Sequence, residues 1–257
     1  MHIFSNILKN IGLKKNDIVF VHSNLTNLSL QRNFIEICEN LYDSIIEIIG
    51  KDSSLIVPTF TYDNFNKNKV FNNKKTFSET GLFPEFVRLK KNSKRTNHPL
   101  YSICGVGKNL DLIFKSINRN STGKGSPFER LLKFDVKILH IDIELVYACT
   151  FLHYIEEKMN VPYRYSKYYN YKIVDDQNKQ FILEYENYVR MTEFYEFPKQ
   201  SKNIQKDLIR NKILKLVWFK KSFFSLVSSK KLYNYFCKKL KINPFYIYGS
   251  KLNKINW

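Results

Sequence analysis

The sequence is poor in the residues that divide a chain into loops and linkers. Only 8 of its 257 residues are glycine and 7 are proline, so no low-complexity stretch marks a domain boundary, and we expect one domain over residues 1–257. The 4 cysteines are dispersed without a CxxC pair, which indicates reduced thiols that fill a core. No run of about 18 uncharged apolar residues and no signal-peptide pattern is present, so we expect a cytoplasmic protein without a transmembrane segment.

Acidic residues are also scarce. The chain has 42 Lys and Arg against 23 Asp and Glu, a net charge of +19. This excess favours anionic partners, although drift in an AT-rich genome would enrich lysine in the same way, and both explanations stay open. The charges do not form one stripe and no nucleic-acid-binding motif is evident, so we expect no specific nucleic acid. The basic, aromatic tail from Ile213 to Tyr248 leaves a weak membrane-surface association open.

The apolar residues suffice for one large core. Hydrophobic residues make up 44% of the chain and aromatic residues 16%. Residues 17–23 (DIVFVHS) and 54–60 (SLIVPTF) are short apolar runs typical of buried strands. Between them, apolar residues recur at helical spacing from Phe34 to Ile49, and Gly50 follows where a left-handed cap would lie. This unit predicts parallel strands joined by a crossover helix, and therefore an α/β fold.

Later patterns complete a single, three-layer-like domain. We expect strands at residues 100–107 and 136–143, helices at 84–91 and 150–159, and an antiparallel hairpin at 168–185. Beyond Asn203, two apolar faces at helical spacing predict closing helices. The first face is Ile209, Ile213, Leu216 and Val217, and the second is Leu232, Tyr235 and Phe236. The expected architecture is a largely parallel central sheet, an antiparallel hairpin and C-terminal helices.

The most chemically suggestive cluster is HYIEE. Spacings of three and four residues place His153, Glu156 and Glu157 on one face of a helix. A carboxylate there would orient the imidazole and stabilise its charged form, as a general base requires. An ordinary surface helix with a His–Glu pair has the same spacing, so the pattern alone leaves both interpretations open. We expect no metal, because residue 157 is Glu rather than a second His and His140 belongs to another element.

Other catalytic motifs are absent from the sequence. GVGK (residues 105–108) lacks the third glycine of a dinucleotide fingerprint, and GKGS (residues 123–126) lacks the spacing of a Walker A loop. No GxSxG elbow surrounds a serine. Nucleotide-cleaving enzymes and conventional serine hydrolases are therefore poorly supported.

Six ordered segments carry a family resemblance. They are VHSNL (21–25), VPTFTYDNF (57–65), GLFPEFVR (81–88), RTNHPLYSICGVG (95–107), GKGSPFERLL (123–132) and TFLHYIEE (150–157). In order and approximate spacing they resemble the aminoglycoside 3-N-acetyltransferase family. The resemblance implies an enzyme that transfers an acetyl or other acyl group from coenzyme A to an amine. Two departures from the family pattern are present. The segment HIDIELVYACT before Phe151 suggests an altered acceptor cleft, and the extra residue between Arg95 and His98 is either a loop adjustment or a sign that the arginine is misaligned.

The resemblance also implies roles for individual residues in direct transfer within a ternary complex. His153 would be the general base, Glu156 its orienting carboxylate, and Thr59 an oxyanion donor. The implied coenzyme A contacts are Ser23, Asn24, Leu25, Lys124, Ser126 and Phe128. The implied acceptor contacts are Arg95, His98 and Glu157. Structural explanations stay open for several of them: Ser23 and Thr59 as caps, Lys124 as a solvated loop charge, His98 as a structural residue, and His22 nearby as a core histidine.

The net charge of the protein affects which acceptor substrate we expect. A protein of charge +19 repels a polycationic aminoglycoside unless a local acidic pocket overrides the field, whereas a nucleoside diphosphate sugar is an anion. We therefore expect a nucleotide-linked amino sugar used in surface polysaccharide synthesis, held by Arg88, Arg95 or Lys124. The alternatives are an aminoglycoside 3-N-acetyltransferase that confers resistance, or a non-catalytic basic protein that binds membrane surfaces or nucleic acid. The sequence leaves the oligomeric state open, and a dimer is compatible with it.

Overall fold

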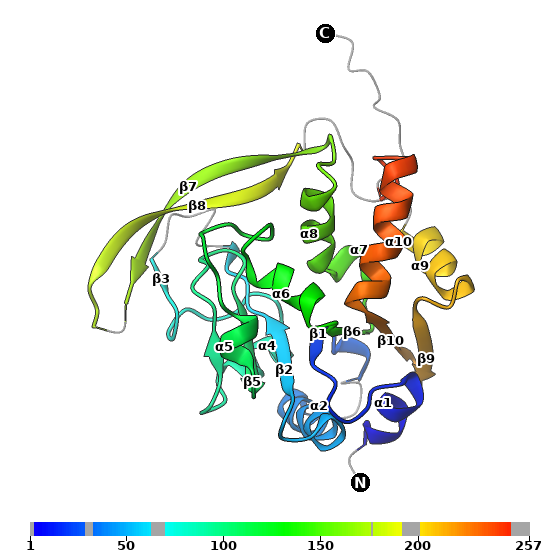
Figure 1. Ribbon diagram of the computed structural model, residues 1–257. Coiled ribbons are helices and arrows are strands. Elements are labelled where there is room, and N and C mark those ends of the chain that lie inside the picture. Colours follow the sequence, from blue (N-terminus) through cyan, green and yellow to red (C-terminus); the bar gives the residue numbers. More distant parts are fainter. Residues whose placement is uncertain (1–2, 29–32, 63–69, 176, 192–200, 248–257) are drawn as a thin grey trace.

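A computed structural model describes residues 3–28, 33–62, 70–175, 177–191 and 201–247, and Figure 1 shows its arrangement. The helices are α1 Ser5–Ile11, α2 Phe34–Ile49, α4 Leu82–Arg88, α5 Leu110–Ile113, α6 Pro127–Lys133, α7 Leu145–Ala148, α8 Phe151–Lys158, α9 Ser201–Arg210 and α10 Ser229–Ile242, with a 3-10 turn at Thr26–Leu28. The strands are β1 Val19–Ser23, β2 Ser54–Pro58, β3 Phe71–Asn72, β4 Lys94–Arg95, β5 Ile103–Gly107, β6 Lys137–Ile141, β7 Arg164–Val174, β8 Gln180–Arg190, β9 Lys215–Phe219 and β10 Ser222–Ser228.

The central sheet has seven strands in the order β4-β5-β2-β1-β6-β10-β9. Its middle strands β2, β1 and β6 are parallel, and the outer strands on both sides pair antiparallel. Side chains on one face pack against α5, α6, α8 and α10, and those on the other face against α1, α2 and α4. The predicted α/β fold with a sheet between helices is confirmed, although its parallel part is confined to the middle.

The strand, helix and strand predicted near the N-terminus form β1, α2 and β2. The three apolar residues of β1 are buried, as expected of a strand covered by helices on both faces. The Asn33 side chain caps α2 by accepting a hydrogen bond from the Ile35 amide, and Gly50 follows the helix with a φ of 79°. β1 and β2 run parallel with Val19 opposite Leu55, which places α2 in the crossover between them.

The predicted hairpin is longer than expected. β7 and β8 pair along their whole length from Arg164–Arg190 to Val174–Gln180, and β3 joins the outer end of β7. Figure 1 shows this two-stranded arm extending from the helical body. On the face turned to the body, Tyr171 and Tyr185 pack against Leu100. The arm therefore forms a second, smaller sheet with its own apolar cluster.

The C-terminal region corrects one prediction. Leu216 and Val217 were expected on a helix, but they lie in β9, which pairs antiparallel with β10 through a turn at Lys220. Their spacing from Ile209 fits a helix, yet the run KLVWF is rich in the branched and aromatic residues that strands favour. The predicted helix with Leu232, Tyr235 and Phe236 is confirmed as α10.

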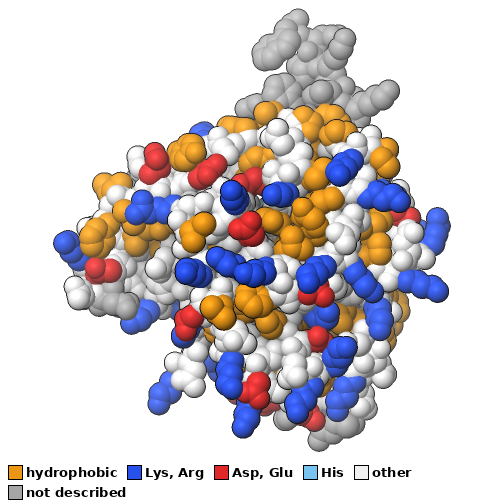
Figure 2. Space-filling view, in the orientation of Figure 1, with side chains coloured by type: hydrophobic (Ala, Val, Ile, Leu, Met, Phe, Trp, Pro, Cys, Tyr) orange, Lys and Arg blue, Asp and Glu red, His pale blue; other side chains and the backbone are white. Residues whose placement is uncertain are grey.

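Surface charge and cysteine positions agree with the sequence analysis. Figure 2 shows Lys and Arg spread over the viewed face with Asp and Glu among them. Cys38, Cys104 and Cys149 are buried, Cys237 is half-buried, and all four are free thiols. Among the described residues, no helix has both the length and the apolarity needed to cross a bilayer.

Candidate active site

His153 and Glu156 lie in direct contact on α8. The Nδ1 atom of His153 is 2.9 Å from Oε2 of Glu156, as their three-residue spacing predicts. The Glu156 side chain is 2% exposed, whereas the His153 side chain is 26% exposed. The carboxylate is therefore buried behind an imidazole that solvent reaches.

Two residues just after α8 complete the surroundings of Glu156. Arg164, at the start of β7, places its Nε 2.8 Å from Oε2 of Glu156 and its Nη2 3.0 Å from Nδ1 of His153. The Tyr163 hydroxyl donates to the other carboxylate oxygen over 3.0 Å. Every oxygen of Glu156 thus faces a donor, which fixes the carboxylate in one orientation.

This environment favours a neutral imidazole and an ionised carboxylate. Burial and the nearby Arg164 lower the pKa of His153, while Glu156 acts in the opposite direction. For Glu156, burial opposes ionisation, but Arg164 and His153 outweigh it and hold its pKa below the usual value. At neutral pH the pair therefore consists of an uncharged ring and a charged carboxylate.

One helical turn beyond His153 on α8, Glu157 joins a second polar cluster. The Asn120 amide donates to Oε1 of Glu157 and to Oε2 of Glu186, each over 2.9 Å. The Thr122 hydroxyl donates to the other oxygen of Glu157 over 3.1 Å. Gly123 has no room for a side chain, since an added Cβ would lie 1.6 Å from a Glu157 oxygen. The loop before α6 is thereby fitted closely around Glu157.

The cluster opens onto a groove beneath the hairpin arm, which we call the hairpin groove. It has a volume of about 580 Å³ and is lined by residues 116–120, Tyr168, Glu184 and Glu186. A neighbouring pocket of about 330 Å³ shares part of the same loop and extends to His98. The Tyr101 ring lies 6.0 Å from that of His98 and 6.1 Å from that of His153. The groove is thus connected to the His153–Glu156 pair in two ways, through Asn120 and Glu157 on α8 and through the rings of His98 and Tyr101.

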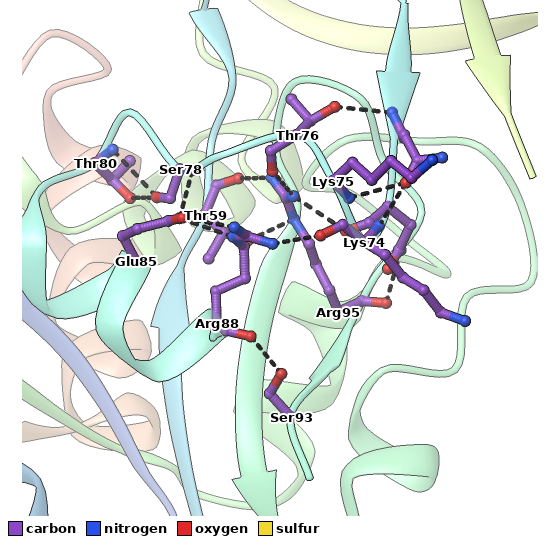
Figure 3. Close-up of polar contacts among 12 residues, drawn as sticks. Thr59, Lys74, Lys75, Thr76, Ser78, Thr80, Glu85, Arg88, Ser93 and Arg95 are labelled. Carbon is purple, nitrogen blue, oxygen red and sulfur yellow. Dashed lines mark hydrogen bonds and ion pairs between the residues drawn. The ribbon is translucent and has the colours of Figure 1, made fainter. Parts of the chain in front are cut away.

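Thr59 and Arg95 lie in a buried network instead (Figure 3). Thr59 is fully buried, and its hydroxyl contacts Ser102 and the Nε of Arg95, the latter over 3.1 Å. The other nitrogens of Arg95 donate to the carbonyls of Thr59, Asn73 and Thr76, and burial lowers its pKa to about 10. These contacts hold β2, β4 and the segment after β3 together. Within the described residues, the contacts of Thr59 and Arg95 do not include His153, although Arg95 lines the pocket that extends to His98.

His98 is buried among tyrosines. Its Nδ1 accepts hydrogen bonds from the amides of Leu100 and Tyr101, so the ring proton lies on Nε2. Burial lowers the pKa of His98 to about 3. The ring is therefore neutral and offers a donor rather than a proton-accepting nitrogen, and its acceptor-side role stays a prediction.

The predicted coenzyme A contacts differ in how accessible they are. Asn24 and Lys124 are exposed and Ser23 is half-buried, whereas Ser126 and Phe128 are fully buried. Phe128 packs in the core against Phe20. The backbone amide of Asn24 donates to the Ile141 carbonyl, and the short 3-10 turn Thr26–Leu28 follows.

His22 and His140 form a pair that the sequence did not predict. They lie opposite each other on β1 and β6 with stacked rings 5.2 Å apart, and both are buried. Burial lowers the pKa of His140 to about 3. Such neutral rings fit the core-histidine interpretation of His22. Within the described ranges, no three His, Cys, Asp or Glu side chains gather in a group able to hold a metal ion.

Sequence reasoning missed Arg164, Asn120 and Glu186. Arg164 lies 11 residues after His153, and Asn120 and Glu186 are 66 residues apart. Arg164 meets the site because β7 begins beside α8, and Asn120 and Glu186 meet because β8 passes the loop before α6. The segment VPYRYSKYY carried no signal for Arg164 apart from its position at the start of a strand.

Comparison with known proteins places the chain in a family. A sequence model described as aminoglycoside 3-N-acetyltransferase matches residues 20–241. A search of curated proteins found no match.

Solved structures share the fold at low identity. "AAC-IIIb binary with CoASH" superposes with a TM-score of 0.78 at 15% identity, covering 93% of this chain and 95% of that one. AAC-VIa bound to sisomicin gives 0.77 at 17% identity, covering 93% and 96%. The YokD protein from Bacillus subtilis gives 0.75 at 20% identity, covering 93% and 98%. Since the family model matches most of the sequence, the chain belongs to the aminoglycoside 3-N-acetyltransferase family and is an acetyl-CoA-dependent N-acetyltransferase.

Proposed function

We propose that the chain transfers the acetyl group of acetyl-CoA to an amine of an aminoglycoside, with His153 as general base and Glu156 as the carboxylate that orients it. The observation that carries this proposal is the contact between His153 and Glu156, one helical turn from Glu157, which Asn120 connects to Glu186 in the hairpin groove. This acceptor differs from the nucleotide sugar that net charge led us to expect. The comparisons with known proteins give no support to a nucleotide sugar. The family and the ligands named in its solved structures favour the alternative.

The hairpin groove has the local acidity that a polycation needs. Glu157 and Glu186 both contact Asn120, and Glu184 lines the same groove. Arg119 is the basic residue in this lining, and its guanidinium lies 6.0 Å from the Tyr185 ring. Carboxylates at close range overcome the long-range repulsion of a +19 protein, because salt screens the distant charges more strongly than the near ones.

The arginines expected to hold a diphosphate are occupied within the protein. Arg88 binds Glu85 through two nitrogens, at 2.7 and 2.5 Å, and its side chain is 8% exposed. Arg95 donates to backbone carbonyls and hydroxyls in the buried network. Of the three basic residues considered, Lys124 is exposed. Of these three residues, a nucleotide sugar would therefore find Lys124 alone uncommitted to other groups in the described part of the protein.

The chemistry follows from the arrangement at His153. When Nδ1 donates to Glu156, the lone pair on Nε2 is available to accept a proton from the attacking amine. The buried carboxylate then stabilises the imidazolium that forms. Cys149 lines the small pocket beside His153, but burial raises the pKa of its thiol to about 12 and keeps it protonated. Direct transfer without an acyl-enzyme fits this arrangement.

Acetyl-CoA supplies the activated acetyl group, and exposed or unpartnered polar groups of this chain fit its contacts best. Among the predicted residues these are the Ser23 hydroxyl, which has no partner among the described residues, and the side chains of Asn24 and Lys124. Leu25, Ser126 and Phe128 would act by shaping the core beneath them, because their side chains are buried.

A thiol-release assay with purified protein tests the acceptor. Sisomicin, apramycin, kanamycin and gentamicin are compared with uridine- and thymidine-diphosphate amino sugars, at low and high salt. We expect turnover of at least one aminoglycoside, with KM rising as salt screens the groove carboxylates. Turnover of nucleotide sugars alone would refute the aminoglycoside acceptor and leave the acetyltransferase activity intact. The matched variants Glu186→Gln in the groove and Glu36→Gln on α2 separate local acidity from net charge.

A further inference from the structure

Arg164 contacts both members of the His153–Glu156 pair, although it lies on a different element. Its Nη2 is 3.0 Å from Nδ1 of His153, and its Nε is 2.8 Å from Oε2 of Glu156. Its Nη1 donates to the Tyr188 carbonyl on β8 over 3.2 Å. With 6% of its side chain exposed, the guanidinium has little freedom to turn away.

These contacts give Nδ1 of His153 two neighbours of opposite kind. The guanidinium is a permanent donor, and the ionised carboxylate is a permanent acceptor. The ring nitrogen can satisfy one of them at a time. If it donates to Glu156, Nε2 is left with a lone pair for a proton. If it accepts from Arg164, Nε2 carries the proton and the ring cannot act as a base.

We propose that Arg164 is a positioning residue that keeps His153 uncharged between turnovers, while Glu156 selects the tautomer whose Nε2 accepts a proton. This inference rests on the proposed role of His153 as general base. A cation 3.0 Å from the ring disfavours imidazolium, and the same cation holds Glu156 in the place where it can receive the Nδ1 proton. Arg164 thus opposes the ring charge directly and supports the base through Glu156.

The other groups around the ring do not replace Arg164. On α8 the facing charge is Glu156, on β8 it is Arg190, and from the loop before β5 the Tyr101 ring lies 6.1 Å away. Arg190 stands opposite Arg164 in the hairpin register and disfavours the charged ring less than Arg164 does. It therefore provides a matched control, since it carries the same charge on the neighbouring strand.

Ring titration by NMR of histidine-labelled protein tests the proposal without any acceptor. The His153 signal is assigned by its loss in His153→Gln. We expect Arg164→Gln to raise the titration midpoint by about one pH unit or more and Arg190→Gln to raise it less. Arg164→Lys keeps the charge, so its midpoint should stay near that of the wild type while kcat falls. Glu156→Gln should lower the midpoint, because Arg164 is then unopposed.

An unchanged or lower midpoint in Arg164→Gln would overturn the proposal. If that variant does not fold, Arg164→Lys decides, since an unchanged kcat in that variant would show that the placement of the guanidinium between His153 and Glu156 has no effect on the base. The acid limb of the kcat/KM profile should move with the NMR midpoint. Midpoint shifts without turnover of any acceptor would refute the proposed function and leave the effect of Arg164 on the ring standing.

Discussion

Replacing Glu156 with glutamine should destabilise the folded protein as well as slow acetyl transfer. One Glu156 oxygen accepts from Tyr163, and the other contacts Arg164 and His153. A glutamine can keep its oxygen towards Arg164 and turn its amide to the Tyr163 hydroxyl, which then accepts. The hydrogen bonds survive, but Arg164 loses its buried counter-charge.

The magnitude follows from that lost charge. Removing one partner of a buried ion pair costs about 3–5 kcal/mol as a rule, and the retained hydrogen bonds place Glu156→Gln at the lower end, about 3 kcal/mol. Tyr163→Phe removes a single hydrogen bond to the same charged carboxylate and should cost about 1.5 kcal/mol. Comparing Glu156→Gln with Tyr163→Phe therefore separates the contribution of the Glu156 charge to stability from that of one hydrogen bond.

Urea denaturation of the two variants and the wild type measures these differences through the transition midpoint at constant slope. The pKa of Glu156 is lowered in the folded protein, so its contribution is complete above the ordinary value of 4.5 and is lost as the pH falls through the folded value. The gap between wild type and Glu156→Gln should therefore close in acid. A gap below about 0.5 kcal/mol at pH 7 would mean that Arg164 does not depend on this carboxylate, against our reasoning.

Further predictions concern catalysis, packing and acid stability. His153→Gln should lower turnover by roughly two to four orders of magnitude with little change in coenzyme A affinity by calorimetry; near-normal turnover would place the base elsewhere. Gly123→Ala should push Glu157 away from its partners and raise the acceptor KM, whereas an unchanged KM would show that Glu157 does not shape the groove. Glu186→Gln should raise that KM several-fold at low salt and less at high salt. Because the pKa of His140 is about 3 when folded, stability should fall as pH drops below about 6.5, by about 1.4 kcal/mol per unit for this residue, and His140→Phe should flatten that slope in urea titrations.

The sequence by itself determined the features that depend on neighbours along the chain. The apolar run of β1 and the helical periodicity of Phe34–Ile49 specify their elements locally, and the hairpin follows from two strands around a polar turn. The contact of His153 with Glu156 was predictable for the same reason, because three residues along a helix bring two side chains to one face. The ordered motifs identified the family without any spatial information.

The tertiary structure alone decided which groups surround that pair. Arg164 reaches it because the chain returns from α8 into β7, and Glu186 meets Asn120 because β8 passes the loop before α6. The pairing of His22 with His140 depends on the order of strands in the sheet. Net charge pointed to an anionic acceptor, yet the carboxylates that favour a cation come from α8 and β8. Pairwise electrostatic energies depend on distance and burial, and a sequence specifies neither until the chain has folded.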